Sequence, residues 1–321
     1  MKTEILPAGE TAIAAAVTAL RAGEAVALPT ETVYGLAADA LNPTAVARIF
    51  EAKERPRFDP LIVHLPDRFW LDRLTQIPSE GRKVVDELTA AFWPGPLTLV
   101  LPRTRQVPDL VTAGLDHVAV RLSAHPVLAA ILESFGQPLA APSANRFGRI
   151  SPTAAAHVLE ELAGRIRLIV DGGPTVHGLE STIVAVRDSR LEVLRRGPVT
   201  TEQLCAFGEV VERHGSTIEA PGQMPSHYAP RTPLVLADDI RHFAGERSRC
   251  GLLAWRSAPA GGEFAQVRVL SPRGDLREAA ANLFRLLRDL DHYGLDAIVA
   301  ETMTEEGLGA AIMDRLRRAA A

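Results

Sequence analysis

Short apolar runs and helical patterns alternate along most of the chain. Residues 25–28 are apolar and predict a buried strand that ends at Pro29. Beginning at Pro43, apolar residues recur at the spacing of one helix face, and residues 61–63 then predict a second strand. Strand, helix and strand in this order are typical of an α/β fold.

The same alternation continues through the first two thirds of the chain. We expect further helices at residues 8–21, 67–75, 81–92, 125–135, 154–162 and 200–207. We expect further strands at residues 97–101, 118–122, 166–170, 183–186 and 191–194. These elements are sufficient for one larger α/β domain.

The last part of the chain repeats the alternation on a smaller scale. Strands are predicted at residues 234–237, 252–255, 267–270 and 297–300, and helices at residues 276–290 and 308–319. This order predicts a small, parallel, doubly wound sheet. The region has neither a GxGxxG loop nor a P-loop, so its sequence gives no sign of nucleotide binding.

A segment rich in Pro, Gly and Ser, residues 215–233, separates the two patterned regions. It is too long for an ordinary connection, which favours a linker between domains. His227 and Tyr228 lie within it, although pure spacers rarely contain aromatic residues. We predict a larger domain at residues 1–212, a linker at residues 213–232 and a smaller domain at residues 233–321.

Composition and charge exclude several classes of protein. The 321 residues carry a net charge of −4, and from Gly215 onward 13 basic residues face 14 acidic ones. Neither region has the basic excess of a protein that binds nucleic acid broadly, so we expect direct binding of any nucleic acid, tRNA included, to be weak or absent. The chain has no apolar run near the roughly 18 residues that span a bilayer, and its N-terminus lacks a signal-peptide core. We therefore expect a cytoplasmic protein without a membrane partner.

The metal-binding residue types are scattered. Cys205 and Cys250 form no CxxC pair, and the nine histidines lack the HExxH spacing of a zinc site. The sequence therefore predicts neither a disulfide framework nor a protein-held metal.

Three cations follow the helix that begins at Pro43. Lys53, Arg55 and Arg57 are spaced two residues apart, and Pro56 breaks the helix between them. Such a loop can neutralise a polyphosphate. Basic residues in the last turn of a helix can also simply complement its macrodipole. Arg57 lies beyond the helix on a stiffened loop, which favours a binding role.

An arginine and two polar turns are further candidates for ligand contacts. Arg121 lies in an apolar strand, where it needs solvent, a partner or a ligand, and its planar fork suits a carboxylate. Ser143 and Asn145 lie in a Pro-Ser-x-Asn turn, and Ser181 lies at a strand entrance. Serine and asparagine are also common in turns that bind nothing.

Ordered motifs carry a family resemblance. The segments PTETVYGL, KxRP, PLIVH, WPGPLTLVL, VAVRL, APSAN, GLESTIV and HYAP occur in this order over nearly the whole chain. The chain resembles the threonylcarbamoyl-AMP synthases of the YrdC-like family, in their long, two-domain form. The resemblance implies a twisted-sheet catalytic domain with a central basic cavity and a C-terminal Rossmann-like domain. It also implies that the linker folds over the active site.

The resemblance implies a reaction and its ligands. That family joins L-threonine, bicarbonate and ATP, releases pyrophosphate, and passes its product to a tRNA threonylcarbamoyl transferase complex. Mg²⁺ would be held through the ATP phosphates, with no tightly bound organic cofactor. Lys53 and Arg55 would be catalytic. Threonine would be bound by Thr32, His64, Arg121 and Ser181. ATP would be bound by Lys53, Arg55, Asp59, His117, Ala141, Ser143, Asn145, Ser151, Arg195 and Tyr228.

Two of these positions depart from the family pattern. Asp59 stands where asparagine is expected, and a carboxylate repels phosphates unless it faces Mg²⁺ or Lys53. His117 stands where a hydroxyl residue is common.

Two alternative functions are considered. A YrdC-like fold could serve as an RNA- or nucleotide-binding module without synthase activity, but the complete set of motifs argues against this. A carbamoyltransferase-type domain of hydrogenase maturation would carry additional zinc-finger-like cysteine pairs, which this chain lacks.

Overall fold

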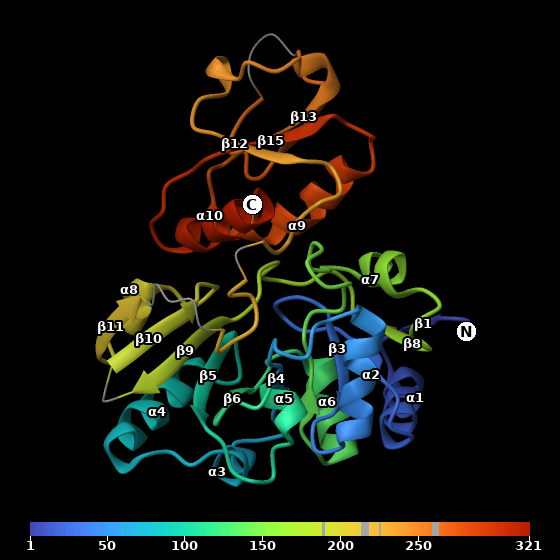
Figure 1. Cartoon of the computed structure of the whole chain (residues 1–321), viewed down its shortest axis with the longest axis vertical. Coiled ribbons are helices and arrows are strands. Elements are labelled where there is room, and N and C mark those ends of the chain that lie inside the picture. The colour runs from blue at the N-terminus through green and yellow to red at the C-terminus, as the bar shows by residue number, and fades with distance from the viewer. Residues whose placement is uncertain (188–189, 213–217, 225, 259–262) are drawn as a thin grey trace. The chain divides into compact units, whose positions relative to one another are not determined.

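The predicted strands of the larger domain join an 11-stranded sheet in the computed structural model. The structure describes residues 1–321 except 188–189, 213–217, 225 and 259–262 (Figure 1). Its strands are β1 (Glu4–Pro7), β2 (Val26–Leu28), β3 (Gly35–Asp39), β4 (Ile62–His64), β5 (Leu97–Pro102), β6 (His117–Arg121), β7 (Leu139–Ala140), β8 (Leu168–Asp171), β9 (Thr182–Arg187), β10 (Arg190–Arg195) and β11 (Glu209–Glu212). Their order in the sheet is β1-β8-β2-β3-β7-β4-β6-β5-β9-β10-β11.

Helices cover both faces of this mixed sheet. They are α1 (Glu10–Arg21), α2 (Pro43–Lys53), α3 (Phe69–Leu74), α4 (Ser79–Phe92), α5 (Asp109–Thr112), α6 (Pro126–Phe135), α7 (Ala155–Leu162) and α8 (Thr201–Leu204). Side chains alternate across a strand, so Val26 and Leu28 of β2 pack with α1 and α6, whereas Ala27 packs in the core that contains α2 and α7. The sheet is therefore buried on both faces at β2.

The end of α2 brings its last lysine into the interior. Asn42 caps the helix by accepting hydrogen bonds from the backbone of Thr44 and Ala45, and Pro43 begins it. The helix ends at Glu54, which adopts a left-handed conformation with φ 54°. Lys53 in the last turn is consequently buried.

A second unit contains a smaller, wholly parallel sheet. Its strands are β12 (Leu234–Ala237), β13 (Cys250–Ala254), β14 (Gln266–Val269) and β15 (Ala297–Glu301), in the order β12-β15-β13-β14. Helices α9 (Leu276–Asp291) and α10 (Leu308–Ala319) pack together along one face (Figure 1). Two short 3-10 turns, Ile240–His242 and Arg247–Arg249, precede β13. The predicted separate parallel sheet is confirmed.

The two units do not follow a single cut in the sequence. The first contains Met1–Phe147, Pro152–Thr175 and Glu180–Gln223, and the second contains Gly148–Ser151, Val176–Leu179 and Met224–Ala321. The predicted linker, residues 213–232, is thus shared between them, and its residues 213–217 and 225 lie outside the described residues. Within the described ranges, none of the helices is both apolar and long enough to traverse a bilayer.

Several elements were not expected from the sequence. The strands β1, β3, β7 and β11 and the short helix α5 were missed. β1 and β11 lie at the two edges of the sheet and are largely exposed, so they lack an apolar run. β3 reads Gly-Leu-Ala-Ala-Asp, and small residues give a weak strand signal.

Gly197 allows a close backbone approach beside Ser181. A Cβ at this position would lie 2.5 Å from Glu180 O and 2.5 Å from Thr182 N. We expect Gly197→Ala to lower the free energy of unfolding by about 1–3 kcal/mol, as overpacking does. Urea denaturation measures this change. Gly9→Ala is the matched control, since its Cβ would meet nothing within 4 Å, and an equal loss in both variants would contradict the prediction.

Candidate active site

Arg121 is held inside the first unit by three different partners. It ends β6, opposite His64 of the parallel strand β4, and is 3% exposed. Its Nε donates to Gly95 O at 3.1 Å, and its Nη1 donates to Thr32 Oγ1 at 3.0 Å. Its Nη2 forms an ion pair with Glu31 Oε1 at 2.6 Å. The guanidinium is therefore fixed before any ligand arrives.

Glu31 is buried beside Arg121 and remains ionised. Its carboxylate accepts hydrogen bonds from the Ser123 hydroxyl and, at 3.1 Å, from Ala124 N. Burial alone raises the pKa of Glu31, but the Arg121 cation and these hydrogen bonds outweigh burial and lower that pKa to about 2. The turn thus supplies a permanent negative charge.

His64 is a neutral imidazole in the same cluster. Burial, with the Arg121 charge beside it, lowers the pKa of His64 to about 3, against a smaller opposing effect of Glu31. Its buried Nδ1 has no hydrogen-bond partner among the residues that the structure describes. The ring is uncharged beside a cation, so its Nδ1 can form a hydrogen bond with a ligand.

Lys53 is bound to the turn that contains Ser143 and Asn145. Its Nζ donates to Ser143 O at 2.6 Å and also to Asn145 O. Two of its three N–H bonds are thus used by backbone carbonyls. Burial, followed by the nearby Arg55 charge, lowers the pKa of Lys53. Helix α2 and a turn 90 residues away are held together at this point.

Arg55 organises the loop that follows α2. Its Nε donates to Asp59 O at 3.2 Å and its Nη2 to Pro60 O at 2.8 Å, and the same Nη2 forms an ion pair with Asp59 Oδ2 at 2.9 Å. Burial raises the pKa of Asp59, and the charges of Arg55, Lys53 and Arg195 offset only part of this rise. One buried carboxylate therefore lies among three cations.

Arg195 connects this cationic group to Ser181. Its Nε donates to Ser181 O and its Nη2 to Ser181 Oγ, both at 3.1 Å, and its Nη1 donates to Pro221 O at 3.2 Å. The Ser181 hydroxyl is also 2.8 Å from Thr98 Oγ1. Most of the predicted site residues of the first unit are thus joined in two clusters, around Arg121 and around Asp59.

Ala141 and His117 are placed differently. Ala141 is buried and donates its backbone N–H to the carbonyl of Ile62, two residues before His64 on β4. His117 begins β6, so about 13 Å of strand separate it from Arg121. The charges that act on His117 are those of Arg187, Glu219 and Asp116, and burial lowers its pKa. The structure does not bring it into either cluster.

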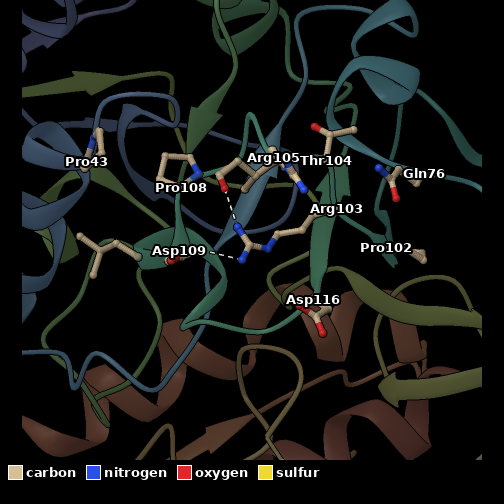
Figure 2. A pocket seen from close by; sticks show the side chains of 11 residues that line it. Pro43, Gln76, Pro102, Arg103, Thr104, Arg105, Pro108, Asp109 and Asp116 are labelled. Atoms are coloured by element: carbon tan, nitrogen blue, oxygen red, sulfur yellow. Dashed lines mark hydrogen bonds and ion pairs between the residues drawn. The ribbon is translucent and has the colours of Figure 1, made fainter.

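A surface pocket opens near the start of β6. It has a volume of about 770 Å³, and Pro102, which pairs with His117, and Asp116 contribute to its wall. Figure 2 shows the Arg103 guanidinium in this pocket, bonded to Asp109 and to the Val107 carbonyl. None of the predicted site residues lines it.

Ser151 and Tyr228 belong to the second unit. Both are buried, and Tyr228 is 1% exposed with a left-handed φ of 67°. Its ring stacks on Phe284 of α9, with centroids 5.5 Å apart, and the Arg315 guanidinium of α10 lies 5.1 Å from its centroid. The linker tyrosine is therefore anchored by the two helices of the smaller sheet.

Sequence reasoning missed Glu31, Thr30 and Thr98. Glu31 was visible as a carboxylate in a turn between apolar segments, and a buried carboxylate needs a cation. Its partner, 90 residues further along, could not be identified without the strand register.

The low pKa of Glu31 predicts a pH-dependent contribution to stability. A carboxyl whose pKa falls from 4.5 to about 2 on folding stabilises the fold above pH 4.5, and loses that effect as the pH falls toward 2. We expect the unfolding free energy of the wild type, relative to Glu31→Gln, to fall by about 3 kcal/mol over this range. Urea denaturation between pH 2 and 6 tests it, with exposed Glu133→Gln as control. A difference that stays constant with pH would contradict the assignment.

Known proteins resemble the chain over almost its whole length. The sequence model described as "Telomere recombination" matches residues 18–197, and the one described as "Threonylcarbamoyl-AMP synthase, C-terminal domain" matches residues 199–321. A threonylcarbamoyl-AMP synthase of Pyrococcus abyssi is 40% identical and covers 94% of this chain and 91% of its own. One of Bacillus subtilis is 41% identical and covers 99% of this chain and 95% of its own.

A solved structure shares the whole fold. The crystal structure of P. abyssi Sua5 complexed with L-threonine has a TM-score of 0.90 at 38% identity, and the match covers 99% of this chain and 98% of that chain. The predicted α/β architecture is therefore confirmed. With family models over both regions, the chain belongs to the threonylcarbamoyl-AMP synthase family, in its two-domain form.

Proposed function

We propose that this chain joins L-threonine, bicarbonate or CO₂, and ATP into threonylcarbamoyl-AMP and pyrophosphate. This reaction would be the first step of N6-threonylcarbamoyladenosine formation at position 37 of ANN-decoding tRNAs. The observation that carries this proposal is the pair of buried clusters in one unit. One presents an arginine fork suited to a carboxylate, and the other presents three cations suited to phosphates.

Threonine would bind around Arg121. The guanidinium retains one N–H on each terminal nitrogen, the number that a two-oxygen carboxylate contact uses. The neutral His64 ring, Thr32 and Ser181 would complete the subsite. The L-threonine complex of the similar P. abyssi structure supports this choice of ligand.

ATP would bind around the cationic cluster. Lys53, Arg55 and Arg195 would face the phosphates, beside Asp59 and the turn of Ser143 and Asn145. Contacts of the nucleotide with Ala141, His117, Ser151 and Tyr228 are further parts of the proposal. His117 is the least supported of these, because its charged neighbours lie outside the cluster.

Mg²⁺ would accompany ATP through the phosphate oxygens. Among the described residues, no group of three or more His, Cys, Asp or Glu side chains could hold an ion. A site lined by cations fits a metal already bound to a polyphosphate. When bound, Mg²⁺ would supply charge neutralisation on the departing pyrophosphate.

Catalysis would come from positioning and charge. The threonine amine forms a carbamate, either with CO₂ and loss of one proton or with bicarbonate and loss of one water. A carbamate oxygen then bonds to the α-phosphorus as the bond to pyrophosphate breaks, and pyrophosphate leaves. Arg121 would hold the threonine carboxylate, and Lys53 and Arg55 would offset charge on the phosphates, in a site from which their burial excludes bulk water. In this proposal the product passes to a tRNA threonylcarbamoyl transferase complex in the cytoplasm.

Pyrophosphate release tests the reaction directly. We expect release from Mg-ATP to require both threonine and bicarbonate, with the carbamoyl-adenylate detected by mass spectrometry. Arg121→Lys should raise the KM for threonine by about ten-fold or more with little change for ATP, because an ammonium cannot form a two-oxygen contact. No release under any combination would refute the proposed reaction.

The anchored linker tyrosine gives a second test. Tyr228→Ala is expected to raise the KM for ATP or threonine several-fold, whereas Tyr228→Phe keeps the stacking on Phe284 and should behave like the wild type. Melting temperatures of both variants separate this effect from loss of stability. Unchanged Michaelis constants for both substrates would eliminate a role of the linker at the active site.

A further inference from the structure

We infer that Glu31 is a positioning residue that fixes the Arg121 guanidinium and, through it, the Thr32 hydroxyl that the guanidinium contacts. This inference rests on the proposed threonine site. Glu31 would not touch the substrate. It would hold in place the guanidinium that binds the substrate carboxylate.

Each nitrogen of Arg121 has one protein partner, and Glu31 is the charged one. Gly95 O and Thr32 Oγ1 are neutral acceptors at 3.1 and 3.0 Å, whereas the Glu31 carboxylate lies 2.6 Å from Nη2. A charge-assisted contact is about twice as strong as a neutral one. Removing it leaves Nη2 without a protein partner and frees the outer part of the guanidinium to rotate.

Glu31 is itself rigid. Its Oε1 accepts from Ala124 N in addition to facing Arg121, and its Oε2 accepts from the Ser123 hydroxyl. The carboxylate is 6% exposed. It therefore transmits the position of the segment before α6 to the arginine.

The same chain of contacts reaches the Thr32 hydroxyl. Arg121 Nη1 donates to Thr32 Oγ1 at 3.0 Å, so one lone pair of that oxygen is used by the guanidinium. Thr32 Oγ1 also lies 2.8 Å from Thr30 Oγ1, which accepts from the backbone N–H groups of Thr32 and Val33. A shift of the guanidinium would therefore also disturb the Thr32 hydroxyl.

Two substitutions distinguish an effect of Glu31 on the position of Arg121 from an effect of the Glu31 charge. In Glu31→Gln the amide oxygen can accept from Arg121 and Ala124, and the amide nitrogen can donate to Ser123, so the geometry is kept while the charge is removed. Glu31→Ala removes both. If Glu31 positions Arg121, threonine should bind Glu31→Gln as tightly as the wild type or more tightly. It should bind Glu31→Ala about ten-fold or more weakly, the loss of roughly one charge-assisted contact.

Calorimetric titration of threonine into the three full-length proteins makes the comparison. ATP affinity and the KM for ATP should stay unchanged, with the loss in Glu31→Ala appearing as a raised KM for threonine that Glu31→Gln rescues. Tighter threonine binding in both variants would show a role of charge alone and overturn the inference. Equal binding in all three proteins would also overturn it.

Further outcomes distinguish a failure of this inference from a failure of the proposed function. Absence of threonine binding by the wild type would refute the proposed function and this inference with it. If Glu31→Ala does not fold, Ser123→Ala removes one of the hydrogen bonds that hold Glu31, and we expect several-fold weaker threonine binding with unchanged ATP affinity. Unchanged threonine binding in Ser123→Ala would then count against positioning.

Discussion

Burial of positive charge is the constraint on which the first unit depends. Lys53, Arg55, Arg121 and Arg195 are all buried, and a buried cation is costly unless charge or hydrogen bonds compensate it. Backbone carbonyls accept hydrogen bonds from Lys53, Arg55 and Arg195. Two carboxylates, Glu31 and Asp59, form ion pairs with Arg121 and Arg55. The loops at the strand ends are shaped by these contacts.

The sheet supports this arrangement through register and close packing. The parallel pairing of β4 and β6 sets His64 opposite Arg121, and an antiparallel bridge joins Gly35 to Ser143. Small residues allow such approaches, since a Cβ on Gly35 would lie 3.3 Å from the side chain of Ala141. Local sequence and long-range contacts therefore agree at the site.

Much of the fold could be predicted from periodicity. The helix that begins at Pro43 and the parallel C-terminal sheet follow from apolar spacing and from residues that cap or break elements. The edge strands β1 and β11 could not be predicted, because exposed strands have no apolar face to mark them. The family motifs identified the candidate residues, but the separation of two residues in the sequence does not give the distance between them in the fold. His117 and Arg121 lie on the same strand but have different charged neighbours. Glu31 forms an ion pair with Arg121, which lies 90 residues later in the sequence.

The hydrogen bonds of Lys53 have a consequence for the charge of the phosphate cluster. A neutral amine keeps two N–H bonds, which is as many as the carbonyls of Ser143 and Asn145 receive. These carbonyls therefore do not require an ammonium, and burial opposes one. Arg55 and Arg195 cannot lose their protons. Lys53 is thus the one of these three basic groups whose charge its surroundings can modulate, and a bound polyphosphate would favour its ammonium form.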